Sequence, residues 1–254
     1  MPNLTKQDII TTIQVGQPVS IIRYGDGESI VLNSTEGLQQ MELASTAVIK
    51  RQTGYDPTMV EVKAIRQNLI DAYTGADIIG IPMHVHKTSK HWTNAKSVLD
   101  ANVPLHSEQY CDIDVAYQML EEDGYHQILQ NRRVLNYISC RNLDEGFQQR
   151  YNIHTVNRYE IAPEMKFTSG YDGFRHYPTQ FNRVQRWMDV VGADEGKLLL
   201  VGAGVIGKIY CNWWRDRGGV AFDIGGVMDI FAGKVTRGPE RGLDKDEVNP
   251  VYKL

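Results

Sequence analysis

The sequence predicts an α/β fold, a single Rossmann-like domain with a mainly parallel sheet and helices on both faces. Three observations predict it. Short apolar runs alternate with segments of helical periodicity along all 254 residues. No repeat or Pro/Ser-rich linker divides the chain, and its length is typical of one large domain, so residues 1–254 are expected to form one domain. Two glycine-rich loops each follow a strand-like run, as ligand-binding loops do in such folds.

In the first half of the chain, apolar spacing and helix-ending residues mark each expected element. Helices are expected where apolar residues recur every three or four positions before a glycine, and Asp56-Pro57 is a typical helix start. Strands are expected where apolar residues run together. In chain order these are a helix over 5–15, a strand over 19–22, a helix over 56–75, a strand over 76–81, a helix over 112–121 and a strand over 133–139.

The second half repeats the alternation. Asn142 and Glu145 have the spacing of a capping box and predict a helix start. The other expected elements are a strand at 159–161, a helix over 181–191, a strand over 198–201, a helix over 206–217 and a strand over 220–224. Residues 82–106 fit this rhythm poorly and are expected to form a long loop or insertion, and residues 234–254 are expected to form a tail.

Composition and charge exclude several classes of protein. Hydrophobic residues make up 42% and charged residues 23% of the chain, and the net charge of −4 gives no sign of a nucleic-acid-binding surface. No run approaches the ~18 apolar residues of a membrane-spanning helix, and the N-terminal residues lack the apolar core of a signal peptide. The three cysteines (Cys111, Cys140 and Cys211) lie far apart, which favours a reducing compartment. We therefore expect a cytoplasmic protein.

The first glycine loop, RYGDGE at residues 23–28, directly follows the strand at 19–22. In an open α/β sheet, ligands bind at the carboxyl ends of the strands, where this loop is expected to lie. Asp26 and Glu28 are two residues apart, so in extended geometry their carboxylates point the same way. Two oxygen donors suit Mg²⁺ or Mn²⁺, which completes its shell with water and diphosphate oxygens.

The other residues of this loop suit the same ligand. Gly25 and Gly27 have no side chains and let a ligand approach the backbone closely. Arg23 offers a positive, forked side chain to the same phosphates. A solvated turn explains the pattern equally well, because Gly-Asp-Gly is common in turns.

The second glycine loop, GAGVIG at residues 202–207, matches the dinucleotide-binding pattern GxGxxG. It follows a strand and opens a helix, and Asp223 lies some twenty residues downstream at the end of the next strand. One interpretation is an NAD(P)-dependent oxidoreductase, although only about thirty residues follow Asp223 and a second nucleotide-binding half would need a permuted chain. Another is that Gly202 and Gly204 contact a phosphate or a sugar nucleotide without NAD. Close packing of helix on strand is the structural alternative.

Together the two loops, with the DIG segment at residues 223–225, resemble the GT-D glycosyltransferases, a superfamily that includes the former domain of unknown function 1792. The similarity spans residues 5 to about 232. It implies a hexosyltransferase-type enzyme that moves a sugar from a nucleoside diphosphate sugar, expected to be UDP-linked, to a hydroxyl of a glycan or glycosylated acceptor.

The resemblance also implies roles for particular residues. Asp26 and Glu28 form the Asp-x-Glu (DxE) motif of this family, which implies that they hold Mn²⁺ or Mg²⁺ and the donor diphosphate, with Arg23 nearby. Members of the family often have a histidine after the DIG segment, whereas this chain has Gly226. The catalytic base is therefore not carried over from the family.

Two further residues are candidates because of where they lie. Asp223 ends the last strand, and its carboxylate is a candidate general base for the acceptor hydroxyl; a turn residue is the alternative. Arg141 follows the strand over 133–139, so it is expected at the same sheet edge, where it binds a phosphate or caps the next helix. A non-catalytic nucleotide-binding module remains a third function to weigh.

Overall fold

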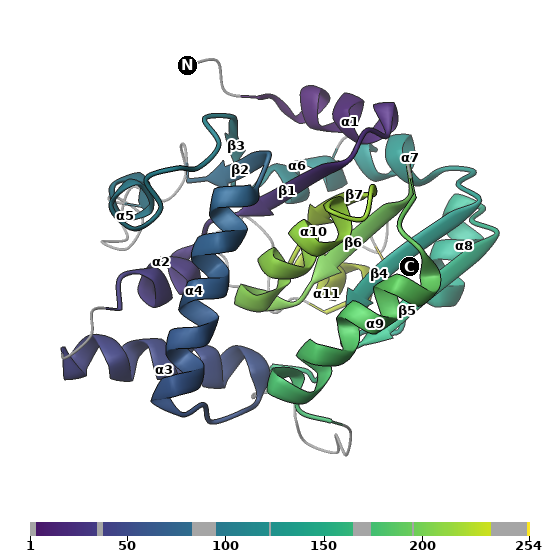
Figure 1. Ribbon diagram of the computed structural model, residues 1–254. Helices are drawn as coiled ribbons and strands as arrows, with labels where there is room; N and C mark the ends of the chain where they lie inside the picture. Colours follow the sequence, from purple (N-terminus) through teal and green to yellow (C-terminus); the bar gives the residue numbers. More distant parts are fainter. Residues whose placement is uncertain are drawn as a thin grey trace.

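The computed structural model describes residues 4–34, 38–82, 95–121, 123–164, 174–194, 196–234 and 253–254. In these residues, seven parallel strands form one sheet in the order β3-β2-β1-β7-β6-β4-β5 (Figure 1). The strands are β1 (Val19–Arg23), β2 (Ile78–Ile81), β3 (Tyr110–Asp112), β4 (Val134–Ser139), β5 (Thr155–Glu160), β6 (Leu198–Gly202) and β7 (Val220–Asp223). The predicted α/β class with a parallel sheet is confirmed.

Helices pack on both faces of this sheet, as predicted (Figure 1). One face is covered by α4 (Met59–Gly75), α9 (Phe181–Val191) and α10 (Gly207–Arg215). The other is covered by α1 (Lys6–Val15), α6 (Val115–Glu121), α7 (Gly124–Leu129), α8 (Asp144–Tyr151) and α11 (Val227–Phe231). Further helices are α2 (Asp26–Leu32), α3 (Gln39–Thr53), α5 (Ala95–Asn102) and the short η2 (His176–Gln180) and η3 (Gly204–Ile206).

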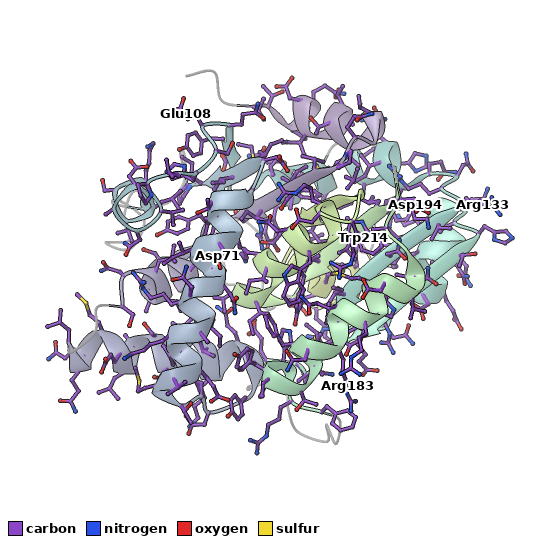
Figure 2. The ribbon with its side chains drawn as sticks, in the orientation of Figure 1. Asp71, Glu108, Arg133, Arg183, Asp194 and Trp214 are labelled. Atoms are coloured by element: carbon purple, nitrogen blue, oxygen red, sulfur yellow. The ribbon has the colours of Figure 1, made fainter. Side chains whose placement is uncertain are left out.

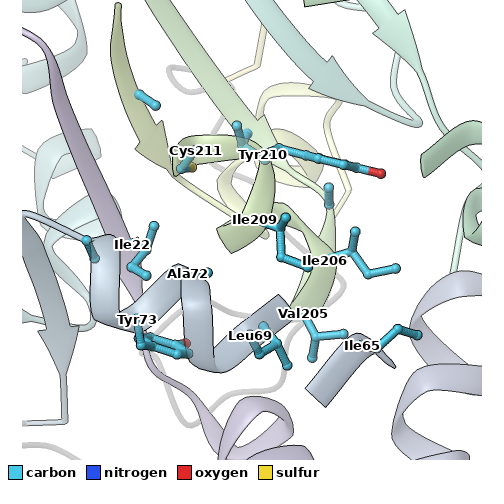
Figure 3. Packing of buried hydrophobic residues seen from close by; sticks show 14 of the residues in the cluster. Ile22, Ile65, Leu69, Ala72, Tyr73, Val205, Ile206, Ile209, Tyr210 and Cys211 are labelled. Atoms are coloured by element: carbon cyan, nitrogen blue, oxygen red, sulfur yellow. The ribbon is translucent and has the colours of Figure 1, made fainter. Parts of the chain in front are cut away.

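Side chains of the central strands alternate between two hydrophobic cores. Leu199 belongs to one core and Leu198 and Leu200 to the other, because successive residues of a strand point to opposite faces. In the first core, Leu69 of α4 and Ile209 of α10 are buried in one cluster, where α4 packs on α10 (Figure 3). This packing fixes the start of α10, and the glycine loop before it, against the sheet.

Several charged side chains lie at the periphery of the molecule. Figure 2 labels five that are exposed, and it also labels Trp214, which is fully buried; the five are Asp71, Glu108, Arg133, Arg183 and Asp194. Over the described ranges, no helix has both the length and the apolar content needed to cross a membrane.

The segments that follow the neighbouring strands β1 and β7 leave the sheet on opposite faces. β1 continues into α2, whose buried residues join the first core, whereas β7 continues into α11 in the second core. The two neighbouring strands are parallel, so their carboxyl ends lie at the same edge. Connections that leave adjacent parallel strands on opposite faces open a crevice, and ligands of open α/β sheets bind there.

Two local predictions differ from the structure. The helix expected over 112–121 begins only at Val115, because residues 110–112 form the edge strand β3. The prediction of a capping box at Asn142 and Glu145 is wrong. Leu143 is the N-cap of α8 and makes no side-chain cap hydrogen bond. Asn142 instead accepts a hydrogen bond from the backbone N–H of Asp144, at 3.2 Å.

The expected loop and tail are described only in part. Of residues 82–106, the stretch 83–94 lies outside the described residues, while Ala95–Asn102 form the helix α5 rather than a loop. Of the tail, residues 235–252 lie outside the described residues. The backbone N–H of Leu254 donates to the carbonyl of Phe231 at 2.9 Å, so the last residue lies against the end of α11.

A buried histidine predicts that stability depends on pH. His176 is 1% exposed, with Nε2 2.9 Å from the hydroxyl of Tyr210, and burial lowers its pKa from 6.5 to about 3. The unfolded state therefore binds more protons between these values, so the free energy of unfolding falls as pH drops below 6.5. We expect a loss of about 3 kcal/mol between pH 7 and pH 4.5 from this residue.

Urea denaturation of the wild type and of His176→Gln at both pH values measures this effect. Glutamine keeps a polar group near Tyr210 but does not titrate, so the variant should lose less stability than the wild type on acidification. Equal losses in the two proteins would mean that His176 protonates freely in the folded state.

Candidate functional site

A cleft lies at the carboxyl edge of the sheet, and both glycine loops face it. It is lined by residues of the strand ends and of the elements that follow them: Arg23, Gly25, Asp26, Glu28, Gln52, Ile113, Tyr117, Ser139, Cys140, Arg141, Ile161, Ala162, Glu164, Gly202, Ala203, Gly204, Lys208, Gly225, Gly226, Met228 and Asp229. The loops after β1, β4, β6 and β7 therefore meet in one place, as the sequence analysis expected.

Four charged side chains meet beside this cleft, Arg23, Glu28, Lys208 and Asp223, which we call the charge network. The first three line the cleft, and Asp223 lies fully buried against Arg23 and Lys208. The ammonium of Lys208 lies 2.7 Å from Glu28 Oε1 and 3.0 Å from Asp223 Oδ2. Arg23 Nε lies 3.4 Å from Asp223 Oδ2, and its Nη2 lies 3.5 Å from Oδ1. The most exposed of these side chains, that of Arg23, is only 11% exposed, so water screens the pairs weakly.

Asp223 and Lys208 are held in their charged forms by their neighbours in the charge network. Burial disfavours the charged form of Asp223, but Arg23 and Lys208 outweigh it and lower the pKa of this carboxyl. Burial likewise acts to lower the pKa of Lys208, but Asp223 and Glu28 outweigh it and raise that pKa. Two cations and two carboxylates thus balance each other in a buried setting, where each unpaired charge would be costly.

Glycines shape the second glycine loop and the segment that follows β7. Gly204 has a φ of +58°, in the left-handed region that favours glycine, and a Cβ there would overlap the amide oxygen of Gln52. Gly225 has a φ of +50°, and a Cβ there would overlap the guanidinium of Arg23. Close packing of helix on strand applies at Gly207, where a Cβ would lie 3.0 Å from Val201 Cγ1 of β6, whereas the neighbour of Gly204 is a side chain of α3. Neither contact excludes a ligand, since the loop still lines the cleft.

Gln52 of α3 ties the two glycine loops together, and sequence reasoning missed it. Its side-chain oxygen accepts a hydrogen bond from the backbone N–H of Val205 at 2.6 Å. Its amide nitrogen would lie 2.7 Å from a Cβ at Gly27, so it also lies against the first loop. The backbone of both loops is thereby held in one arrangement before any ligand binds.

Asp26 and Glu28 do not share a face, so the prediction from extended geometry is wrong. Both lie in the first turn of α2, where residues two apart point about 200° apart around the helix axis. Asp26 is exposed, and its Oδ1 accepts the backbone N–H of Gly27 at 2.8 Å. Glu28 is 5% exposed, and its Oε2 accepts the backbone N–H of Gly25 at 3.0 Å, which caps the helix.

These contacts limit how a divalent metal fits here. Both oxygens of Glu28 are engaged, one by Lys208 and one by the backbone of Gly25. Within the ranges that the structure describes, no three His, Cys, Asp or Glu side chains gather as a metal site. Mg²⁺ is commonly held by one or two carboxylates together with substrate phosphates. The residues present therefore fit an ion shared between Asp26 and a diphosphate, and do not fit joint chelation by Asp26 and Glu28.

Asp223 ends β7 as expected but does not line the cleft, and its geometry argues against a role as general base. Its side chain is fully buried, and both carboxylate oxygens face Arg23 or Lys208. An acceptor hydroxyl does not reach it in this arrangement, and the lowered pKa makes it a weak base. The same burial removes it from the ribose hydroxyls that an NAD-binding aspartate would hold, which weakens the oxidoreductase interpretation.

Arg141 lies at the cleft, beside the end of β4. Its Nε lies 2.7 Å from Oδ1 of Asp229 at the start of α11, and the two side chains are 11% and 17% exposed. The pair holds the guanidinium against α11, and Arg141 also lines the cleft.

Comparisons with known proteins agree with the two-loop resemblance, which is confirmed. A family model described as a GT-D fold-like domain matches residues 3–231. A solved structure of the highly conserved domain of unknown function 1792, described as having a distinct glycosyltransferase fold, is similar with a TM-score of 0.58 and 12% identity, covering 90% of this chain and 79% of that chain.

A structure described as a new glycosyltransferase of that domain, from Streptococcus sanguinis, is similar with a TM-score of 0.57 and 14% identity, covering 90% of this chain and 82% of that chain. At these identities the likeness shows a shared fold. A search of curated proteins found no match to the sequence.

Proposed function

This chain belongs to the GT-D fold-like family, and from that premise we propose that it transfers a sugar from a nucleoside diphosphate donor, UDP-linked by preference, to a hydroxyl of a glycan or glycosylated acceptor. One observation carries the proposal: both glycine loops, the exposed Asp26 and two arginines line a single cleft at the carboxyl edge of the sheet. We retain the cytoplasmic location, inferred from the sequence, as part of the same proposal.

We place the donor diphosphate between the second glycine loop and the segment that follows β7. Gly202 and Gly204 on one side and Gly225 and Gly226 on the other present backbone without side chains to the cleft. Arg141, at the edge of the same cleft, is positioned to approach a phosphate there. Such fixed positive and backbone donors stabilise the charge that develops on the leaving diphosphate during transfer.

Asp26 is the carboxylate that would hold Mn²⁺ or Mg²⁺ together with the diphosphate oxygens. When bound, the ion neutralises the charge of the leaving group. Glu28 has a different task in this proposal, because it caps α2 and holds Lys208. Its contribution to the site is to position the loop that carries Asp26.

A thermal-shift screen tests the proposal. Nucleoside diphosphate sugars should raise the melting temperature, more in Mn²⁺ than in EDTA, and nicotinamide dinucleotides should not, because ligands that bind only the folded state stabilise it. A shift with NADH but with no nucleotide sugar would instead support the oxidoreductase alternative. Binding of a nucleotide sugar without release of nucleoside diphosphate would indicate a binding module.

A further inference from the structure

Lys208 is coordinated as a bound cation would be. Its ammonium makes three contacts with oxygen: Glu28 Oε1 at 2.7 Å, Asp223 Oδ2 at 3.0 Å and the carbonyl of Gly204 at 3.0 Å. A lysine ammonium has three N–H donors, so these contacts use all of them. The side chain is 4% exposed, so neither water nor a ligand phosphate is needed to satisfy the charge.

Two of the three oxygens around Lys208 come from elements far from it in the chain, and the third comes from four residues before it. Glu28 lies in α2, Asp223 ends β7, and Gly204 is in the loop that precedes α10. Without the ammonium, two buried carboxylates would face each other with Arg23 as the nearest remaining cation. Carboxylate and carbonyl oxygens are also the ligands that hard divalent cations prefer.

We propose that the ammonium of Lys208 is the resident cation of this site, in the position where Glu28, Asp223 and the Gly204 carbonyl would otherwise bind a divalent metal ion. The free protein therefore binds no divalent ion at these oxygens. A divalent metal ion binds only together with the nucleotide, with Asp26 as its ligand. This statement about Asp26 rests on the proposed function, whereas the role of Lys208 does not.

The substitution Lys208→Met tests the proposal without any nucleotide. Methionine has a similar length but no charge, so the three oxygens become free while the volume is nearly kept. We expect Mn²⁺ alone to bind the variant at one ion per chain, measured by electron paramagnetic resonance, and to raise its melting temperature by about 5 °C at saturation. The wild type should show neither effect.

Two control variants distinguish replacement of the Lys208 ammonium by a metal ion from a general loss of stability. Lys208→Arg keeps the positive charge and should gain no Mn²⁺ site. The double variant Lys208→Met with Glu28→Gln removes one ligand charge and should lose most of the Mn²⁺ affinity that Lys208→Met gains. If Lys208→Met folds only when Mn²⁺ is added, that result also supports the proposal.

Two results would overturn it. One is a wild-type protein that binds one Mn²⁺ per chain without nucleotide and loses it in Glu28→Gln, which would show that the metal and Lys208 do not compete. The other is a folded Lys208→Met that binds no Mn²⁺. If Lys208→Met does not fold under any condition, titration of the wild type with Mn²⁺ in the absence of nucleotide decides whether the proposal stands. A separate failure of UDP to bind the wild type in Mn²⁺ would count against the proposed function and leave the role of Lys208 standing.

Discussion

Asp223→Asn is expected to lower the free energy of unfolding by about 3–5 kcal/mol, the usual cost of removing one partner from a buried ion pair. The carboxylate is fully buried and meets two cations, Lys208 at 3.0 Å and Arg23 at 3.4 Å. Asparagine keeps the shape but not the charge, so it leaves Arg23 and Lys208 to repel each other with Glu28 as their remaining carboxylate partner. Urea denaturation at neutral pH measures the loss.

Asp189→Asn is the matched control. Asp189 accepts from Arg217 Nε at 2.7 Å, but its side chain is 61% exposed, and a surface ion pair contributes less than about 1 kcal/mol. If both variants unfold at the same urea concentration as the wild type, the charge network does not stabilise the fold. A normally stable Asp223→Asn that lost turnover by roughly 10²–10⁴-fold would restore the general-base role suggested by the sequence.

Asp26→Asn is expected to weaken the affinity for UDP in Mn²⁺ by roughly 10²-fold, because a carboxylate ligand to a metal on the diphosphate contributes several kcal/mol. The side chain is exposed and takes no part in the charge network, so the melting temperature should change little. Calorimetric titration of UDP in Mn²⁺ and in EDTA measures both affinities. In EDTA, the variant and the wild type should bind UDP equally.

Glu28→Gln is the informative comparison for Asp26→Asn. It removes the charge that pairs with Lys208 at 2.7 Å, so it should lower the melting temperature, unlike Asp26→Asn. If the two variants lost Mn²⁺-dependent affinity equally and both melted normally, the two carboxylates would chelate the metal together after all.

The sequence predicted β1, β2, β4, β6 and β7 well, because each is an apolar run with recognisable ends. It missed the short edge strand β3 and gave only the end of β5, because the polar sequence TVNRYE of β5 is not an apolar run. It failed at α2, where Gly25 and Gly27 made a turn the natural interpretation. The helix forms because Glu28 reaches back to cap the N–H of Gly25, a contact that composition and spacing do not reveal. The error carried over to the site, since Asp26 and Glu28 diverge on a helix although they would share a face on a strand.

Other residues of the site depend on contacts between distant parts of the chain. Lys208 follows GAGVIG directly. The dinucleotide-binding pattern assigns roles only to glycines and a downstream acid, so the sequence did not mark Lys208 as a site residue. Gln52 lies 153 residues before Val205, whose backbone it binds, and a single sequence contains no signal for that pairing. The position of Asp223 at the sheet edge was predictable because it ends a predicted parallel strand, whereas its burial between two cations was not.

Release of nucleoside diphosphate is the measurement that tests the central claim most directly. The wild type is incubated with a panel of nucleotide sugars, Mn²⁺ and a mixture of glycan acceptors, and the products are resolved by chromatography with mass detection. The account predicts that one donor yields free nucleoside diphosphate together with a glycosylated acceptor, and that Asp26→Asn slows this release strongly while remaining folded. No release from any donor, or equal release by Asp26→Asn, would contradict it.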